Sequence, residues 1–190
     1  MNRFSVTVQL GLAVFSIGLS MLVRSAPLHA ESKSDMERAA RHALHHLYQT
    51  TPAARALGEK AAGVLIFPEI IKGGFVVAAQ YGNGVLLKRG NVEGYYNTSS
   101  ASFGFQAGVQ KFGYALFFMT EEDLRYLNDS SGWEIGALPS LTIVDTGVAR
   151  SLSTTTLQKG MYAFFFEQRG LMGGLSLQGT KITRIHPDGK

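Results

Sequence analysis

Three histidines form the densest group of side chains able to do chemistry in this sequence: His42, His45 and His46. On a helix, His42 and His46 share one face and are spaced to bind one metal ion together. Their neighbourhood in the sequence supplies no third ligand and no hydrogen-bond partners to hold the rings, and metal sites depend on both. We therefore predict no metal site and no cofactor, and interpret the histidines as part of a solvated helix face.

Other reactive groups are scattered, and no catalytic motif is readable. The sequence has no nucleophile elbow, no His-Glu-x-x-His zinc motif and no glycine-rich phosphate loop. Glu121, Glu122 and Asp123 are explained by the start of a helix, where acidic side chains face the positive end of the dipole. Asp145 and Arg150 are expected to form an ion pair near a strand end. The sequence thus favours a protein that is not an enzyme; the enzymatic alternative needs Asp145, Arg150 and a histidine to converge in a pocket.

An amphipathic segment precedes all the predicted strands. Ser34 and Glu37 have the spacing of a capping box, and apolar residues then recur at helical spacing as far as Tyr48. Thr51 and Pro52 restart the helix, which ends at Gly63. The polar face carries Arg38, Arg41, His42, His45 and His46. This face is either simply solvated or able to lie on anionic lipid headgroups.

From residue 62 the hydrophobic period changes to two, which predicts strands. Pro68 is expected to end the first strand, and residues 81–84 (Tyr-Gly-Asn-Gly) to form a tight hairpin. A helix is expected from Glu121, between the earlier and later strands. The predicted fold is α+β: an N-terminal helix pair packed on a mostly antiparallel, strongly twisted sheet of about eight short strands, with one short helical insert.

The central stretch, residues 94–120, places Gly104, Gln106 and Gly108 on one face of a strand. Two glycines on one face weaken a strand and indicate that something approaches the backbone closely. We expect the helices of residues 34–63 to cover this face. The alternative is an open floor for an acyl chain, with Gln106 and Gln110 at its polar edge.

The first 30 residues have the pattern of a signal peptide. Arg3 is followed by an apolar run at residues 10–23, which is too short to span a bilayer comfortably. We expect cleavage after Ala30, leaving a single domain at 31–190; the alternative is an uncleaved N-terminal anchor. The sequence contains no cysteine, so no disulfide can form in an oxidising compartment. These features predict a periplasmic protein.

The charge balance argues against nucleic acid as a partner. The chain has 18 Lys and Arg against 14 Asp and Glu. Without Arg3 and Arg24, the two basic residues of the first 30, the balance is 16 against 14, a net charge of only +2. No basic run is present, and the aromatic residues are not interleaved with Lys or Arg. We therefore expect no nucleic-acid binding.

Short motifs, most of them rich in glycine, lie at residues 62–68, 72–75, 81–85, 102–108, 133–136 and 170–174. In this order they resemble the SYLF domain family in its bacterial secreted branch. Eukaryotic members of that family bind phosphoinositide membranes, and some bind actin through a Lys/Arg-rich motif near the domain start. Lys88 and Arg89 alone do not make such a motif, so actin is not expected here. What the resemblance implies is lipid or membrane binding.

The expected function is therefore non-enzymatic binding of phospholipid or a membrane surface, peripherally and in the periplasm. Two alternatives are a structural or protein-interaction module without a lipid ligand, and a small outer-membrane barrel. The candidate lipid-binding residues are Arg38, Arg41, His42, His45, Lys72, Lys88, Arg89, Gly104, Gln106 and Gly108.

Overall fold

The computed structural model describes residues 31–129, 133–135, 141–144, 160–170, 177 and 179–187. The chain divides into the units Met1–Ala30 and Glu31–Lys190. The elements of the second unit, in chain order, are α2 (Lys33–Thr50), α3 (Pro52–Gly58), β1 (Gly63–Lys88), β2 (Asn91–Phe118), α4 (Glu121–Asp129), β3 (Trp133–Ile135), β4 (Leu141–Val144), β5 (Met161–Gly170) and β6 (Thr180–Ile185). The α4 helix lies where the sequence predicts it, with the Thr120 hydroxyl accepting from the Asp123 backbone N–H.

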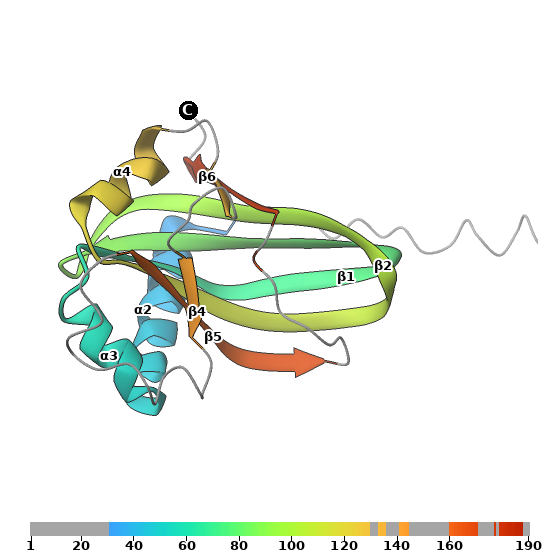
Figure 1. The fold of residues 1–190 in the computed structure, drawn as a ribbon, viewed down its shortest axis with the longest axis horizontal. Coiled ribbons are helices and arrows are strands. Elements are labelled where there is room, and N and C mark those ends of the chain that lie inside the picture. The colour runs from blue at the N-terminus through green and yellow to red at the C-terminus, as the bar shows by residue number, and fades with distance from the viewer. Residues whose placement is uncertain are drawn as a thin grey trace, which may run out of the picture. The chain divides into compact units, whose positions relative to one another are not determined.

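The strands form one curled, mixed sheet in the order β3-β6-β2-β5-β4, with β1 paired to β2 (Figure 1). All pairings are antiparallel except the parallel pairing of β4 with β5. The predicted α+β class is confirmed, but the described residues contain six strands rather than about eight. The reason is length: β1 has 26 residues and β2 has 28, and β1 continues through both the strand end predicted at Pro68 and the turn predicted at residues 81–84.

The β1 strand folds back on itself, and two glycines make this possible. A Cβ on Gly82 would lie 2.6 Å from the carbonyl oxygen of Glu69, and one on Gly84 would lie 2.6 Å from that of Ile66. Real Cβ atoms do not come this close, so only glycine permits this backbone approach. The predicted hairpin at residues 81–84 is therefore wrong. The chain turns instead at Arg89 and Gly90, which both have positive φ.

Pro68 does not end the first strand, contrary to the sequence prediction. The register of β1 against β2 shifts between Phe67 and Ile70. A bulge is one of the few places in a sheet that accept proline, because the residue there need not donate a ladder hydrogen bond. The strand therefore continues past Pro68 with a local irregularity.

Alternate residues of the long strands enter two separate cores. Val64, Ile66 and Phe117 pack toward α2 and α3 in one core. Leu65 and Phe67 point the other way and pack in the second core, which includes residues of α4. The sheet is therefore buried on both faces here, as expected from strands that are apolar at consecutive positions. On α2 the residues of the apolar stripe are 0–5% exposed: Met36, Ala40, Ala43 and Leu47.

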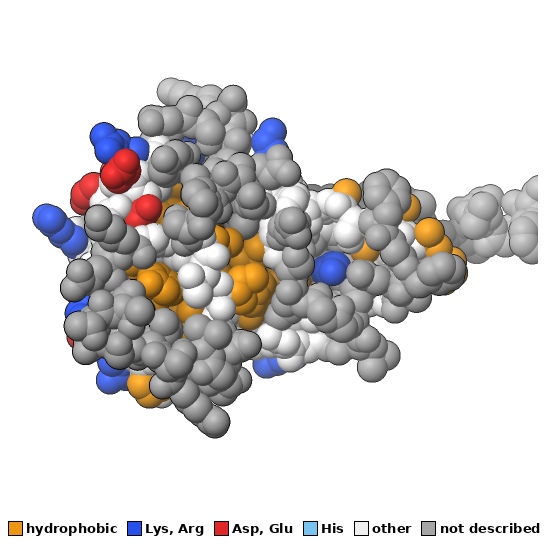
Figure 2. Space-filling view, viewed as in Figure 1, with side chains coloured by type: hydrophobic (Ala, Val, Ile, Leu, Met, Phe, Trp, Pro, Cys, Tyr) orange, Lys and Arg blue, Asp and Glu red, His pale blue; other side chains and the backbone are white. Residues whose placement is uncertain are grey.

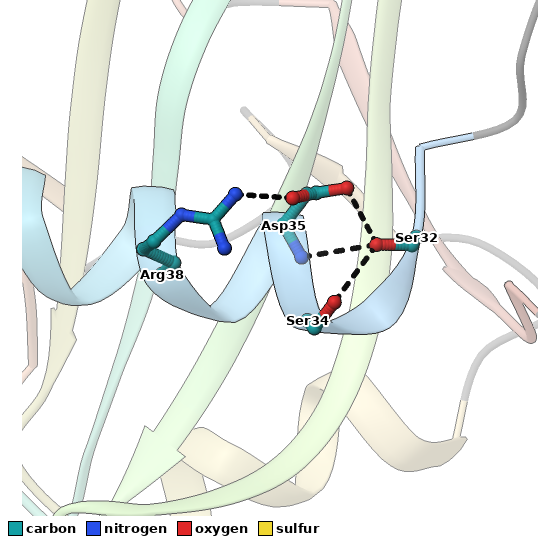
Figure 3. A network of polar contacts seen from close by, with 4 residues as sticks. All are labelled: Ser32, Ser34, Asp35 and Arg38. Atoms are coloured by element: carbon teal, nitrogen blue, oxygen red, sulfur yellow. Dashed lines mark hydrogen bonds and ion pairs between the residues drawn. The ribbon is translucent and has the colours of Figure 1, made fainter.

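The α2 helix begins earlier than the sequence prediction, which placed its cap at Ser34. Ser32 is the N-cap, and its hydroxyl accepts a hydrogen bond from the backbone N–H of Asp35 (Figure 3). The same hydroxyl donates to the Asp35 carboxylate at 2.6 Å. Both Ser32 and Ser34 are suitable caps, and Ser32 allows the acidic Asp35 to lie in the first turn.

A buried hydrogen bond joins the two halves of β2. The Tyr114 hydroxyl donates to the Thr98 hydroxyl at 2.7 Å, and both residues are fully buried. Burial raises the pKa of Tyr114 well above its usual value. The phenol therefore stays neutral and keeps donating to Thr98, which helps to hold the folded-back strand.

The folded-back arrangement predicts that Gly84 does not tolerate a side chain. Gly84→Ala places a methyl group against the Ile66 carbonyl and the Phe67 ring, and we expect a loss of roughly 1–3 kcal/mol of unfolding free energy. Gly73→Ala is the matched control, since its Cβ would meet nothing closer than 3.7 Å. Urea unfolding of both variants measures the difference. Equal midpoints for the two would contradict the close approach.

Candidate functional site

Exposed large hydrophobic residues gather at one end of the β1–β2 ribbon. Among the described residues, six of the seven lie at or near the place where both strands bend. Phe75 is 78% exposed and Val109 is 61% exposed. We call the following set the apolar end: Ile71, Phe75, Val76, Val77, Tyr81 and Val109. Hydrophobic side chains reach the surface at this end in Figure 2, on the right of the view. Clustering of this kind marks an interaction site more often than single exposed residues do.

The bend is produced by an irregular pairing. Between the pairs Phe75↔Ala107 and Val77↔Phe103, β1 contributes only Val76, whereas β2 contributes residues 104–106. Val76 has φ 65°, which a β-branched residue rarely adopts. Strained residues of this kind persist only where the surrounding structure holds them, and they concentrate at functional sites.

Apart from Lys72, which directly follows Ile71, no charged residue lies in the strand segments that form the apolar end. Residues 73–87 and 94–110 contain no Asp, Glu, Lys or Arg. Basic residues adjoin these segments, and we call Lys72, Lys111 and Arg169 the basic collar. Lys111 pairs with Arg169 in the sheet and forms an ion pair with Glu69 at 2.9 Å. The arrangement is an apolar projection bordered by mainly positive charge.

The predicted basic residues of α2 are exposed on its polar face, at a different place from the apolar end. Arg38 forms an ion pair with Asp35 (Figure 3). Arg41 donates to the carbonyl of Gly90 at 2.9 Å. The hydrogen bond from Ser32 and the one from Arg38 hold the pKa of Asp35 below its usual value, so this carboxylate keeps its charge to lower pH. His42 and His45 are also exposed.

The predicted lipid-binding residues are not brought together in one place. Lys72 and Gly108 lie beside the apolar end, whereas Lys88 and Arg89 lie at the β1–β2 turn. Lys88 there forms an ion pair with Glu121 at 2.8 Å. Gly104 and Gln106 belong to β2, within the irregular pairing at the bend, and their side-chain positions lie outside the described residues.

Gly108 is not covered by the helices, so that expectation is wrong for this residue. It is exposed, and a Cβ built on it would meet nothing within 4 Å. Its φ of 138° explains the glycine instead, because L-residues rarely adopt this conformation. Gly104 was predicted to lie on the same strand face as Gly108, but the surroundings of Gly104 are not among those that the structure describes.

The α2 helix cannot present an apolar surface to a membrane while it is docked, because its apolar side chains are buried in the core. None of the described helices is long and apolar enough to cross a membrane. Sequence reasoning missed the apolar end, since it placed a hairpin at residues 81–84. The signal was present in the two uncharged runs, where Phe75, Val76 and Val77 follow one another.

The fold and this surface define a class: an α+β protein with a curled mixed sheet and an exposed apolar end on its longest strands. A family model described as "Ysc84: Las17-binding protein actin regulator" matches residues 99–186. This match confirms the resemblance to the SYLF domain family over that part of the chain, which includes the motifs at 102–108, 133–136 and 170–174. The search of curated proteins found no match.

The strained bend predicts opposite effects for two neighbouring valines that are equally exposed, at 48% each. Val76→Gly removes the positive-φ strain and is expected to raise the unfolding free energy by about 1 kcal/mol, after the extra chain entropy of glycine is subtracted. Val77→Gly has no such strain to relieve and should lower the unfolding free energy by roughly 0.5–1 kcal/mol. Chemical denaturation tests the pair, and a loss in both variants would show that Val76 is not strained.

Proposed function

We propose that this protein is a non-enzymatic, peripheral lipid-binding protein that contacts a membrane surface through its apolar end. The observation that carries the proposal is the gathering of six exposed large hydrophobic residues at the bend of β1 and β2. Water-exposed apolar area of this extent is unfavourable unless a partner covers it. The SYLF resemblance supports the same class of partner.

The form of the apolar end favours a bilayer over a protein groove. Phe75, Val76 and Val77 are consecutive and all exposed, so the bend presents an unbroken run of apolar side chains to solvent. A fluid acyl-chain region accepts such a projection without shape matching. Each large side chain that leaves water gains up to roughly 1.5–3 kcal/mol.

The basic collar favours anionic lipid. Lys72, Lys111 and Arg169 adjoin the uncharged segments, where they would reach the headgroups if the bend entered the bilayer. A basic side chain near an anionic surface contributes about 1 kcal/mol. Arg38 and Arg41 have a smaller role in this proposal, because they belong to α2 and do not adjoin the uncharged strand segments.

The proposed compartment is the periplasm. The support is the pattern of residues 1–30, with Arg3, the apolar run at 10–23 and Ala30, together with the absence of cysteine. Fusing residues 1–30 to a reporter that is active only after export tests this part. An inactive fusion would contradict it, and mass spectrometry of the exported protein would locate the cleavage site.

Flotation of the purified protein with liposomes tests the membrane proposal. We expect wild-type protein to float with vesicles that contain anionic phospholipid. The double variant Phe75→Ser with Val109→Ser should bind roughly tenfold more weakly or worse, because it removes the two most exposed apolar side chains.

Ile143→Ser provides the matched control for this experiment. Ile143 is the exposed large hydrophobic residue of β4, and its removal should leave flotation unchanged. Circular dichroism of all variants checks that they remain folded. Wild-type protein that fails to float at low salt with anionic or zwitterionic vesicles would overturn the proposal and favour the protein-interaction alternative.

A further inference from the structure

Among the residues that the structure describes, Gln110 has the one buried side-chain oxygen or nitrogen without a hydrogen-bond partner. The residue is 4% exposed, and its Oε1 accepts no hydrogen bond. Gln80, which is equally buried, instead donates to the Thr180 hydroxyl at 3.1 Å. A buried acceptor that is left unpaired costs free energy. Each such atom in a folded protein requires an explanation, and a role in binding a ligand is one.

Gln110 lies where the apolar end meets the basic collar. Its neighbours in β2 are Val109 of the apolar end and Lys111 of the basic collar. Lys72 lies directly opposite Gln110 on β1, so these two side chains share a face of the sheet. If the bend enters a bilayer, Gln110 and Lys72 therefore lie at the depth of the lipid headgroups.

The positions around Gln110 on the side of the apolar end carry no side chains. Gly108 lies two residues along β2, and a Cβ built on it would meet nothing within 4 Å. The pairing is regular from Lys72↔Gln110 to Gly74↔Gly108, so Gly108 and Gln110 belong to one face of the strand. On β5 the position opposite Gln110 is Gly170, which has no side chain either. A ligand group that comes over Gly108 can therefore approach the Gln110 amide.

Lys72 places an unneutralised charge next to this acceptor. Lys111 and Lys88 form ion pairs with Glu69 and Glu121. The half-buried Lys72 has no such carboxylate partner in the part of the chain that the structure describes. A cation and a free hydrogen-bond acceptor side by side match a ligand that carries both an anionic group and a hydrogen-bond donor.

We propose that Lys72 and Gln110 form a headgroup subsite that selects phospholipids whose headgroup carries a hydrogen-bond donor. This inference rests on the proposed membrane function and specifies its ligand. The Lys72 ammonium contacts the lipid phosphate. The Gln110 amide turns toward Gly108 and accepts from a headgroup hydroxyl, such as those of phosphatidylglycerol. Gln110 Oε1 thereby gains the partner that it lacks within the protein.

Flotation with two anionic lipids of equal charge tests the subsite. Phosphatidylglycerol has headgroup hydroxyls, whereas phosphatidylmethanol has the same phosphodiester charge and no donor. We expect wild-type protein to bind phosphatidylglycerol vesicles roughly threefold to tenfold more tightly, the effect of one additional hydrogen bond. Gln110→Met keeps the length of the side chain but removes the acceptor, and should bind both kinds of vesicle equally. Lys72→Gln should weaken binding to both and keep the preference, because it removes only charge.

Gln49→Met is the matched control, because Gln49 is an exposed glutamine of α2, and it should keep the wild-type preference. Circular dichroism checks the folding of each variant, and the comparison of the two lipids with wild-type protein needs no variant. Equal binding of wild-type protein to both lipids, or a preference that survives in Gln110→Met, would overturn the subsite and leave the membrane proposal intact. Flotation with neither lipid would overturn both. Excess soluble glycerol 3-phosphate should not reduce flotation, and a reduction would assign the two residues to a free phosphate ester instead.

Discussion

The rest of the structure depends on one close approach, where β1 returns across its own beginning at Gly82 and Gly84. Only a backbone without side chains permits the two halves of the strand to lie so near. Because β1 folds back, β2 must follow it, and β5 and β6 then pair with different halves of β2. The hydrogen bond from Tyr114 to Thr98 joins those halves from inside. The sheet surface on which α2 packs therefore depends on the close backbone approach that Gly82 and Gly84 permit.

Folding the ribbon back also creates the surface to which we assign function. A strand that reverses direction needs a bend, and at the bend the ladder pairing becomes irregular. Phe75 and Val76 lie there with large exposed fractions. The helices cover the other part of the ribbon, where Val64 and Ile66 are buried against α2. The buried apolar side chains that stabilise the fold thus lie at one end of the ribbon, and the exposed apolar side chains lie at the other.

Local patterns predicted the helices and most strand segments, but not the way that the strands join. The α4 helix was predictable because Thr120 and the acids after it form a local start signal. The Asn-Gly pair at residues 83–84 is equally typical of a hairpin, yet here Gly84 lies against Ile66 and Phe67 of the same strand. Pro68 was misjudged for the same reason, since a bulge depends on the partner strand. Glu167 could not be linked to His46 because only the sheet register brings them together.

Backbone strain in the described part of the chain coincides with two features of the surface. Val76 and Glu167 are two of only three non-glycine residues with positive φ among the described residues. The third, Arg89, is explained by the β1–β2 turn. A strained backbone costs roughly 1–3 kcal/mol and needs a compensating reason. For Val76 that reason is the exposed apolar bend, and for Glu167 it is the bulge that brings its carboxylate to 3.6 Å from His46 Nδ1. At both positions the strained residue presents its side chain at the surface, whereas Arg89 is explained by the turn alone.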